Sequence, residues 1–267
     1  MSTSRQAAWP TVLLLVAMYG LLIGNFALYR TTPGPIWLHI AVSTVALHLA
    51  FTIWHEAAHR NLSRHALAND VAGILGILPY MAPYYLERWF HLQHHALLNL
   101  ESDPNYIYMD GPFWQMPIRY PRVLQYARKR MVDDPRTPGQ KVVDTVVPLC
   151  VAGIYALAWW QGALLDLVLL WLVPFVLAKV IMDWYVNYLP HVGLPPDRYR
   201  GTRIVDLPWL TPLLLNHNYH AIHHLWPNIP WYAYRGTFLR KREHLESHGV
   251  PIETRLPGFD GAPVTRP

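Results

Sequence analysis

Four long apolar runs constrain the fold of this chain more than any other feature. They cover residues 9–29, 36–54, 142–160 and 163–184. An α-helix of roughly twenty apolar residues is long enough to cross the hydrocarbon core of a bilayer. Charged residues make up only 15% of the 267 positions, against roughly 25% in a typical soluble domain. The sequence therefore predicts an all-α integral membrane protein with four transmembrane helices arranged as two hairpins.

The distribution of positive charge predicts how these helices are oriented. Arg30 lies in the turn between the first two runs, and Lys179 lies near the end of the fourth. Every other Lys and Arg lies in the N-terminal tail, in the 55–141 loop or after the last run. Short loops rich in Lys and Arg stay on the cytoplasmic side of a membrane. We therefore expect both termini, the loop and the 185–256 region to be cytoplasmic.

The remaining segments fit one domain, which we expect to span residues 1–256, with the loop and the C-terminal region forming a cytoplasmic helical cap. The stretch Val71–Pro83 is apolar but short and broken by Gly and Pro, which predicts a re-entrant or interfacial hairpin. Residues 257–267 are rich in Gly and Pro and are expected to form a flexible tail. Cys150 is the single cysteine, which excludes a disulfide within the chain, and we expect it to pack as a small core residue.

Histidines form the second strong pattern. On a helix, residues three and four positions apart lie on one face, so closely spaced histidines can point at one place. Two of the motifs end the second and fourth apolar runs, and the other two lie in the regions expected to be cytoplasmic. All are therefore predicted at the same membrane face. The motifs are HEAAH with His55 and His59, HLQHH with His91, His94 and His95, NYLPH with His191, and HAIHH with His220, His223 and His224.

This clustering favours metal coordination over separate hydrogen-bonded core histidines. Adjacent cationic imidazoles repel one another, and burial near the membrane disfavours charging them. Coordination uses the neutral ring, and the metal supplies the positive charge. A single zinc takes three or four protein ligands, so nine histidines favour two metal ions. Imidazole suits zinc, copper, nickel and iron alike, but an all-histidine dimetal site at a membrane surface suggests iron that handles O₂.

The HEAAH motif also matches the signature of zinc peptidases. Such an enzyme uses two histidines, one further ligand and the glutamate as general base. That reading leaves the other three motifs without a purpose, so we expect Glu56 to orient a ligand imidazole instead. A metal transporter would carry histidines along its spans, whereas here they gather at one end. No nucleic-acid-binding motif is visible.

The order HxxxH, HxxHH, HxxHH with two helical hairpins resembles the membrane fatty-acid desaturase and hydroxylase superfamily. HLQHHALLNLESDPNY and NYHAIHHLWPNIPWYAYR are most similar to the desaturase-type β-carotene hydroxylases. This resemblance implies that Asn187, one helical turn before His191, holds a metal-bound water. It implies iron ligands at His55, His59, His91, His94, His95, His191, His220, His223 and His224.

The resemblance further implies an O₂-dependent, non-haem diiron oxidoreductase that hydroxylates the β-ionone ring of carotenoids, from β-carotene to β-cryptoxanthin and zeaxanthin. The alternative is an acyl-lipid desaturase or hydroxylase on the same scaffold. The cofactors would be two iron ions cycling between Fe²⁺ and Fe³⁺, with O₂ as co-substrate. Whether hydroxylation or desaturation results depends on geometry at about the 1 Å level.

Electrons must come from an external donor, because the chain has no GxGxxG after a strand, no CxxCH and no cysteine set for an iron–sulfur cluster. The basic segments Arg128–Arg130 and Arg240–Arg242 are expected either to dock an acidic, ferredoxin-type donor or to contact anionic membrane lipid.

Three more residues are expected to support the ligands. Asp103 in ESDPN and Asp183, two turns before His191, are candidates to accept hydrogen bonds from ligand imidazoles. His217 is at ligand spacing from the third box, and we expect it to lie beside the ligands rather than among them. Glu56 is a mild departure, since the first box of the carotenoid enzymes more often carries aspartate at that place.

Overall fold

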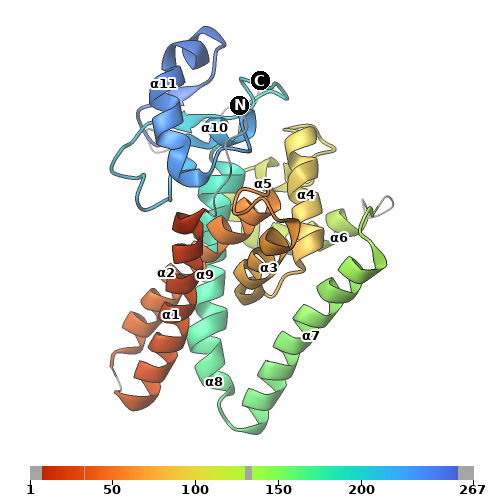
Figure 1. The fold of residues 1–267 in the computed structure, drawn as a ribbon, viewed down its shortest axis with the longest axis vertical. Helices are drawn as coiled ribbons and strands as arrows, with labels where there is room; N and C mark the ends of the chain where they lie inside the picture. Colours follow the sequence, from red (N-terminus) through yellow and green to blue (C-terminus); the bar gives the residue numbers. More distant parts are fainter. Residues whose placement is uncertain (1–7, 33, 130–133, 258–267) are drawn as a thin grey trace. The chain divides into compact units, whose positions relative to one another are not determined.

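The computed structural model describes residues 8–32, 34–129 and 134–257, and most of these are helical (Figure 1). The α-helices are α1 (Trp9–Thr31), α2 (Ile36–Ala58), α3 (Ala66–Ile77), α4 (Tyr84–Ala96), α5 (Tyr106–Met109), α6 (Met116–Lys129), α7 (Pro138–Trp160), α8 (Leu164–Leu167), α9 (Val173–Met182), α10 (His220–Leu225) and α11 (Tyr234–Ser247). Shorter 3₁₀ turns are η1 (Leu78–Tyr80), η2 (Phe113–Gln115), η6 (His217–Tyr219) and η7 (Trp231–Ala233), and π-helical turns are η4 (Val168–Leu172) and η5 (Asp183–Tyr188). Strands β1 (Ile204–Val205) and β2 (Ile252–Glu253) pair in parallel.

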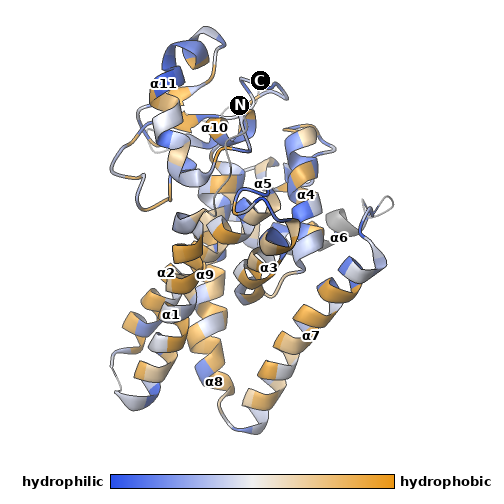
Figure 2. Ribbon diagram, in the orientation of Figure 1, coloured by the Kyte–Doolittle hydropathy of each residue, from blue (hydrophilic) through white to orange (hydrophobic). Residues whose placement is uncertain are grey.

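Among the described residues, four helices are long and apolar enough to span a membrane. They cover Trp9–Thr31, Ile36–Ala58, Pro138–Trp160 and Leu164–Tyr188. The fourth runs continuously through α8, η4, α9 and η5. Apolar residues dominate these helices (Figure 2). The predicted all-α membrane fold with four spans is confirmed, while the orientation and the cytoplasmic position of the cap stay predictions.

The chain divides into two compact units. The first takes in the chain up to Arg88 together with Arg136–Met182, and the second takes in Trp89–Pro135 together with the chain from Asp183 onward. The spanning helices up to α9 belong to the first unit, and α10, α11 and both strands belong to the second. The single domain expected for residues 1–256 stays a prediction, and the expected tail lies, from residue 258 onward, outside the described residues.

A polar cluster joins α1 to α2 in the first unit. Asn25 Nδ2 donates to Ser43 Oγ over 2.9 Å and to the carbonyl oxygen of His39 over 2.8 Å. This fixes the orientation of the amide, so its oxygen accepts from His39 Nδ1–H at 2.8 Å. Hydrogen bonds between helices in apolar surroundings are worth about 1 kcal/mol each, which holds the first hairpin together. His39 therefore has a structural role inside its span.

Two smaller expectations are wrong. The stretch Val71–Pro83 forms most of α3 and the turn η1 rather than a hairpin, and α3 packs along α2. Gly76 allows this close approach, because a Cβ there would lie 2.7 Å from Ile53 Cγ2 and 2.9 Å from Trp54 N. Cys150 is exposed on α7 and is not a core residue. Helix α7 is apolar on most of its circumference, so an apolar run alone does not tell which face is buried.

A buried carboxylate on α7 anchors the start of α4, the helix that carries HLQHH. Asp144 accepts the backbone N–H groups of Tyr85 and Leu86, each over 2.9 Å, and pairs with Arg136 over 2.7 Å. The first N–H groups of a helix have no partner within it, and negative charge there is favoured by the helix dipole. Asp144 is 58 residues or more away from these amides in the sequence, so this cap is a tertiary contact.

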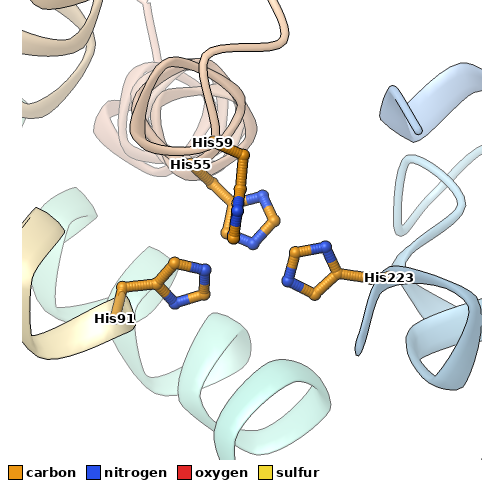
Figure 3. Close-up of side chains that lie close together, drawn as sticks. All are labelled: His55, His59, His91 and His223. Atoms are coloured by element: carbon orange, nitrogen blue, oxygen red, sulfur yellow. The ribbon is translucent and has the colours of Figure 1, made fainter. Parts of the chain in front are cut away.

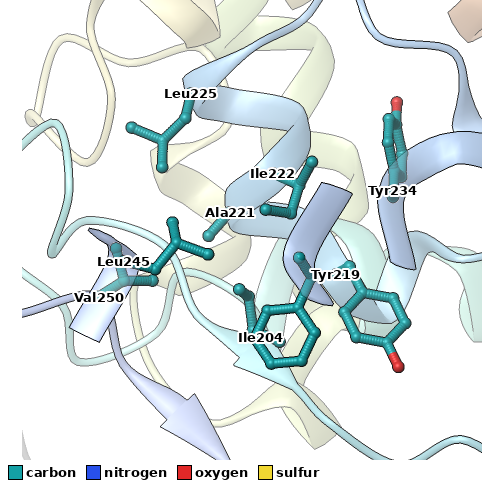
Figure 4. Packing of buried hydrophobic residues seen from close by; sticks show 9 residues of the cluster. Ile204, Tyr219, Ala221, Ile222, Leu225, Tyr234, Leu245 and Val250 are labelled. Atoms are coloured by element: carbon teal, nitrogen blue, oxygen red, sulfur yellow. The ribbon is translucent and has the colours of Figure 1, made fainter. Parts of the chain in front are cut away.

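The second unit has an apolar core that fixes the HAIHH helix (Figure 4). Helix α10 has only six residues, too few to be stable alone, so its packing determines its position. Ala221, Ile222 and Leu225 face the core, which leaves the three histidines of the same turn and a half on the other side. The core consists of Ile204, Tyr219, Ala221, Ile222, Leu225, Tyr234, Phe238, Leu245 and Val250.

We expect Asp144→Ala to lower the free energy of unfolding by about 3 kcal/mol, because it leaves Arg136 as a poorly solvated charge and removes the cap of α4. Thermal unfolding in detergent measures this loss. Asp166→Ala is the matched control, since it breaks the ion pair with the largely exposed Arg30 and should cost less than about 1 kcal/mol. Equal losses in the two variants would contradict the anchoring role.

Candidate metal centre

The second unit brings the HLQHH, NYLPH and HAIHH motifs together. Helix α4 supplies the first of these, the turn after η5 supplies His191, and α10 supplies the last. The ring centroids of His94 and His191 are 4.8 Å apart, and those of His95 and His224 are 4.2 Å apart. These residues are separated by 97 positions or more in the sequence, so the fold itself makes this cluster.

Four of the histidines form one group whose ligand atoms lie within 4.8 Å of one another: His94, His191, His220 and His224. His220 Nε2 lies 3.0 Å from the Nε2 atoms of both His191 and His224. His94, His191 and His220 are each no more than 2% exposed. Three nitrogens that meet this closely, on rings that are largely buried, are arranged as a metal site would need them.

His94 is oriented by a buried carboxylate. Its Nδ1–H donates to Asp103, at 2.8 Å and 3.0 Å from the two carboxylate oxygens. Asp103 is fully buried and also accepts the backbone N–H groups of Asn99 and Asn105. An ionised carboxylate only accepts, so the proton of His94 sits on Nδ1 and the lone pair of Nε2 is free for a metal.

His91, His95 and His223 lie beside this group (Figure 3 includes His91 and His223). His95 Nε2 is 3.1 Å from His91 Nε2 and 2.8 Å from His223 Nε2. The rings of His91 and His223 are stacked with centroids 5.7 Å apart. His223 Nδ1 lies 3.1 Å from the hydroxyl of Tyr234, which is fully buried at the start of α11. That hydroxyl fixes the direction in which the ring of His223 points.

The HEAAH motif lies in the first unit, at the end of α2. His55 is fully buried in the last turn, and His59 follows as the C-cap, with their ring centroids 5.1 Å apart (Figure 3). Arg60 then takes a left-handed conformation with φ of +60°, which ends the helix. Glu56 is fully buried within the same turn.

Burial keeps several of the histidine rings neutral. It lowers the pKa of His191, His220 and His224 well below the ordinary histidine value, and neighbouring imidazoles add to the effect. Burial and the Arg88 guanidinium lower the pKa of His59 to about 3. Neutral imidazole is the form that binds metals, and it suits iron, zinc, copper or nickel rather than magnesium or calcium. The residues present therefore fit an iron site.

Asp183, Asn187 and His217 also lie in the second unit. The hydroxyl of Tyr120 donates to Asp183 over 2.6 Å, and Asn187 Nδ2 donates to the other oxygen of Asp183 over 2.8 Å. Asn105 Nδ2 donates in turn to Asn187 Oδ1 over 3.1 Å. Asp183 thus orients Asn187 inside the π-helical segment η5. His217 is fully buried, but it belongs to neither histidine group found among the described residues of this unit.

Two supporting residues had no strong signal in the sequence. Tyr234 lies 11 residues beyond His223. The aromatic residues of its segment are of the kind expected at a membrane interface. Asn99 lies three residues beyond the second-box helix, in a left-handed conformation with φ of +59°. Asparagine tolerates that conformation, so a helix end was predictable there, but the partners of its side chain are more than 90 residues away.

We expect the metal-free protein to lose stability in mild acid. His191, His220 and His224 have a lowered pKa in the folded state, so below about pH 6.5 the unfolded chain binds more protons than the folded one. Stability is then full above pH 7 and falls as the pH drops towards 5, by up to about 1.4 kcal/mol per pH unit for each histidine. Chemical unfolding in detergent with a chelator, at a series of pH values, measures this. A flat profile between pH 5 and 8 would contradict buried neutral rings.

Comparison with known proteins identifies the family. The model of the family described as fatty acid desaturase matches residues 31–255, which is most of the chain and includes all four histidine motifs. The chain belongs to the fatty acid desaturase family. This confirms the resemblance to the membrane desaturase and hydroxylase superfamily that the histidine motifs predicted.

Several curated relatives are desaturases by name. The chloroplastic omega-6 fatty acid desaturase of Glycine max is 25% identical over 89% of this chain and 63% of the relative. The sn-1 oleoyl-lipid 12-desaturase of Picosynechococcus sp. is 25% identical over 86% of this chain and 75% of the relative. The dihydrorhizobitoxine desaturase of Bradyrhizobium elkanii is 27% identical over 72% of this chain and 64% of the relative.

The chain spans only 57–63% of the length of the four chloroplastic relatives that it matches. The names of these relatives favour the acyl-lipid alternative over the carotenoid ring hydroxylase.

Proposed function

We propose that this protein is an O₂-dependent desaturase of acyl lipids that works with two iron ions. The single observation that carries this proposal is the group of four closely spaced, largely buried imidazoles in a chain of the fatty acid desaturase family. The relatives named as omega-6 and oleoyl-lipid desaturases support an acyl chain as the substrate. The four apolar helices support an integral membrane location, where such a lipid is found.

The nine predicted histidines are the proposed iron ligands. Within the second unit, His94, His191, His220 and His224 would hold one ion. Bound iron supplies the ability to activate O₂ with electrons from outside the chain, so that hydrogen can be removed from an unactivated C–H bond. The protein supplies neutral donors, their orientation and the exclusion of bulk water.

Asn187 supports this arrangement from the side of the fourth span. Asp183 and Asn105 hold the two ends of its amide, so the side chain cannot turn freely. We propose that Asn187 also holds a water bound to one iron, as the resemblance implied. Glu56 and His217, both fully buried, are proposed to support neighbouring ligand rings.

The electron donor is proposed to be an acidic, ferredoxin-type protein that docks on the basic segment of α11. Arg240, Lys241 and Arg242 are all exposed. Lys241 lies 4.9 Å above the ring of Trp226, and Arg242 pairs with Glu246 over 2.8 Å. The other basic segment ends at Arg130, which lies outside the described residues. By the positive-inside rule this docking face and both termini would be cytoplasmic.

A carotenoid ring hydroxylase is the second candidate. The similarity of HLQHHALLNLESDPNY and NYHAIHHLWPNIPWYAYR to β-carotene hydroxylases favours it. Both candidates use the same ligand set and both substrates are apolar, so the metal centre does not separate them.

Expression in bacterial cells that accumulate β-carotene and supply a ferredoxin system tests the substrate. We expect a new double bond in the membrane lipid fatty acids and an unchanged pigment profile, because the substrate is proposed to be an acyl chain. Fatty-acid methyl esters and pigments are measured from the same culture. Hydroxylated carotenoids beside unchanged fatty acids would establish the second candidate instead.

The His94→Ala variant tests the metal ligands. It removes a ring that Asp103 holds in a buried group, so we expect turnover to be abolished and bound iron to fall by at least half. Elemental analysis and the lipid assay measure the two effects. His65→Ala is the control, since His65 is exposed on the surface and should leave both unchanged. Full activity of His94→Ala, or one zinc and no iron in the active protein, would overturn the iron proposal.

A further inference from the structure

We infer that Asn99 is a positioning residue of the metal centre that fixes both the place and the protonated nitrogen of His191. This inference rests on the proposed function, because it assigns the support of one proposed ligand. It concerns the second unit alone, which contains the four-histidine group and everything that Asn99 touches. Asn99 itself is 9% exposed.

The amide nitrogen of Asn99 meets three backbone carbonyl oxygens of the loop that follows His191. Nδ2 lies 2.7 Å from the oxygen of Gly201, 3.1 Å from that of Pro195 and 3.2 Å from that of Leu194. A carbonyl oxygen only accepts, so the NH₂ end of the amide must face these three groups. Turning the amide over would place its oxygen against three other oxygens. The orientation of this side chain therefore has one solution.

This orientation decides the tautomer of His191. With the NH₂ group used by the loop, the amide oxygen is the atom that faces His191 Nδ1, 3.2 Å away. Nδ1 must then carry the proton and donate it, and the lone pair of Nε2 is free. That bare nitrogen is the one that lies 3.0 Å from His220 Nε2, inside the four-histidine group. Asn99 thus sets which nitrogen of His191 is available to a metal.

The same residue is linked to a second ligand through its backbone. The N–H of Asn99 donates to Asp103 over 3.0 Å, and Asp103 accepts from His94 Nδ1–H. One residue therefore connects a ligand on α4 with a ligand that follows the fourth span, 97 positions later. The left-handed conformation of Asn99, with φ of +59°, is what lets its N–H and its side chain point to different partners.

The backbone of the loop that follows His191 presents its carbonyl groups to Asn99. Gly201 presents its carbonyl oxygen to the amide in a place where a side chain does not fit. A Cβ at Gly201 would lie 2.4 Å from the carbonyl oxygen of Asp197 and 2.9 Å from that of Pro195. Because both contacts are to backbone, the loop would have to shift. An alanine at this position should therefore displace the carbonyl groups that orient Asn99.

His191 is supported by the neutral amide of Asn99, whereas His94 is supported by the carboxylate of Asp103. Asp103 offers a negative charge to one ring of the group, and Asn99 offers a neutral acceptor to another. A neutral acceptor fixes the ring without adding charge to a buried site, where an unpaired carboxylate would be costly. The two devices give the same tautomer with different electrostatics, so Asn99 acts on the position of His191 more than on its basicity.

The variant Asn99→Gly tests this inference. Glycine keeps the left-handed backbone and the N–H to Asp103 but removes the amide. Co²⁺ is the probe, because it binds imidazole and its visible spectrum reports the number of ligands. In a titration of the metal-free, full-length protein in detergent, we expect one Co²⁺ site to weaken by 10–100-fold and its tetrahedral absorption to decrease. Gly201→Ala should weaken the same site, and the double variant should lose little more than Asn99→Gly alone.

Asn69→Ala is the matched control. Asn69 is fully buried and its side chain also makes four hydrogen bonds to backbone, with the N–H groups of Leu62 and Ser63 and the carbonyl oxygens of Ser63 and His65. It contacts no imidazole in these bonds. We expect this variant to lower the melting temperature about as much as Asn99→Gly while keeping the Co²⁺ affinity of the wild type.

Nuclear magnetic resonance of ¹⁵N-labelled histidine reports the tautomer of each ring. A purely structural role of Asn99 would leave the tautomer of His191 unchanged. In the metal-free wild type the His191 signal, assigned by its loss in His191→Ala, should show protonated Nδ1, and in Asn99→Gly it should show a mixture of tautomers. Wild-type Co²⁺ affinity and an unchanged His191 signal in Asn99→Gly would overturn the inference, as would an equal loss of affinity in Asn69→Ala. If the wild type itself binds no Co²⁺, the proposed function fails together with this inference.

Discussion

The proposed metal centre depends on one constraint: a buried imidazole must stay neutral and keep one chosen nitrogen bare. A neutral ring has a proton on either nitrogen, and burial alone does not choose between them. The choice is made by an acceptor fixed opposite the other nitrogen, which here is Asp103 for His94 and Asn99 for His191. For His223 the hydroxyl of Tyr234 lies 3.1 Å from Nδ1 and can donate or accept, so it fixes the position of the ring and not its tautomer. Contacts in the surrounding fold keep these groups in place.

Each of these groups is held by further contacts, some of them remote in sequence. Asp103 is tied to the N–H groups of Asn99 and Asn105, and Asn99 is tied to the loop that ends at Gly201. Tyr234 is part of the apolar core that also fixes α10 (Figure 4). The left-handed residue Asn99 follows the second box, and Leu215 and Asn216 are left-handed immediately before the third. Such conformations cost free energy and persist only where neighbouring contacts determine them, as at a functional site.

The sequence predicted well the features that are encoded locally. The four spans follow from the length of the apolar runs, and the observed helices extend the predicted ones by a few residues at their ends. The histidine motifs could be identified because helical spacing places their rings on one face. The expectation that depended on the choice of a buried face was wrong, since Cys150 proved to be exposed, and the Gly and Pro of Val71–Pro83 did not prevent helix up to Tyr80. An apolar helix in a membrane has no polar side to show which face packs against protein.

The supporting residues were harder to predict, and Asp183 and Asn99 show why. Asp183 was expected to accept from a ligand imidazole because it precedes His191 by two turns, and its oxygens accept from Tyr120 and Asn187. The π-helical turn η5 changes the number of residues per turn between Asp183 and His191, so spacing counted on an α-helix does not give the direction of the carboxylate. Asn99 has the opposite problem, since nothing within ten residues of it in the sequence indicates that it meets the loop after His191.

Two similarities of this sequence point to different substrates, a carotenoid and an acyl chain. The motifs that resemble carotenoid hydroxylases, HLQHHALLNLESDPNY and NYHAIHHLWPNIPWYAYR, include the ligands and the residues that orient them, such as Asp103 and Tyr234. Those residues are required by the metal centre whatever the substrate. Similarity there follows from shared chemistry, whereas the relatives named as omega-6 and oleoyl-lipid desaturases match over 89% and 86% of this chain. The similarity over most of the chain is therefore the reason that an acyl chain is the proposed substrate.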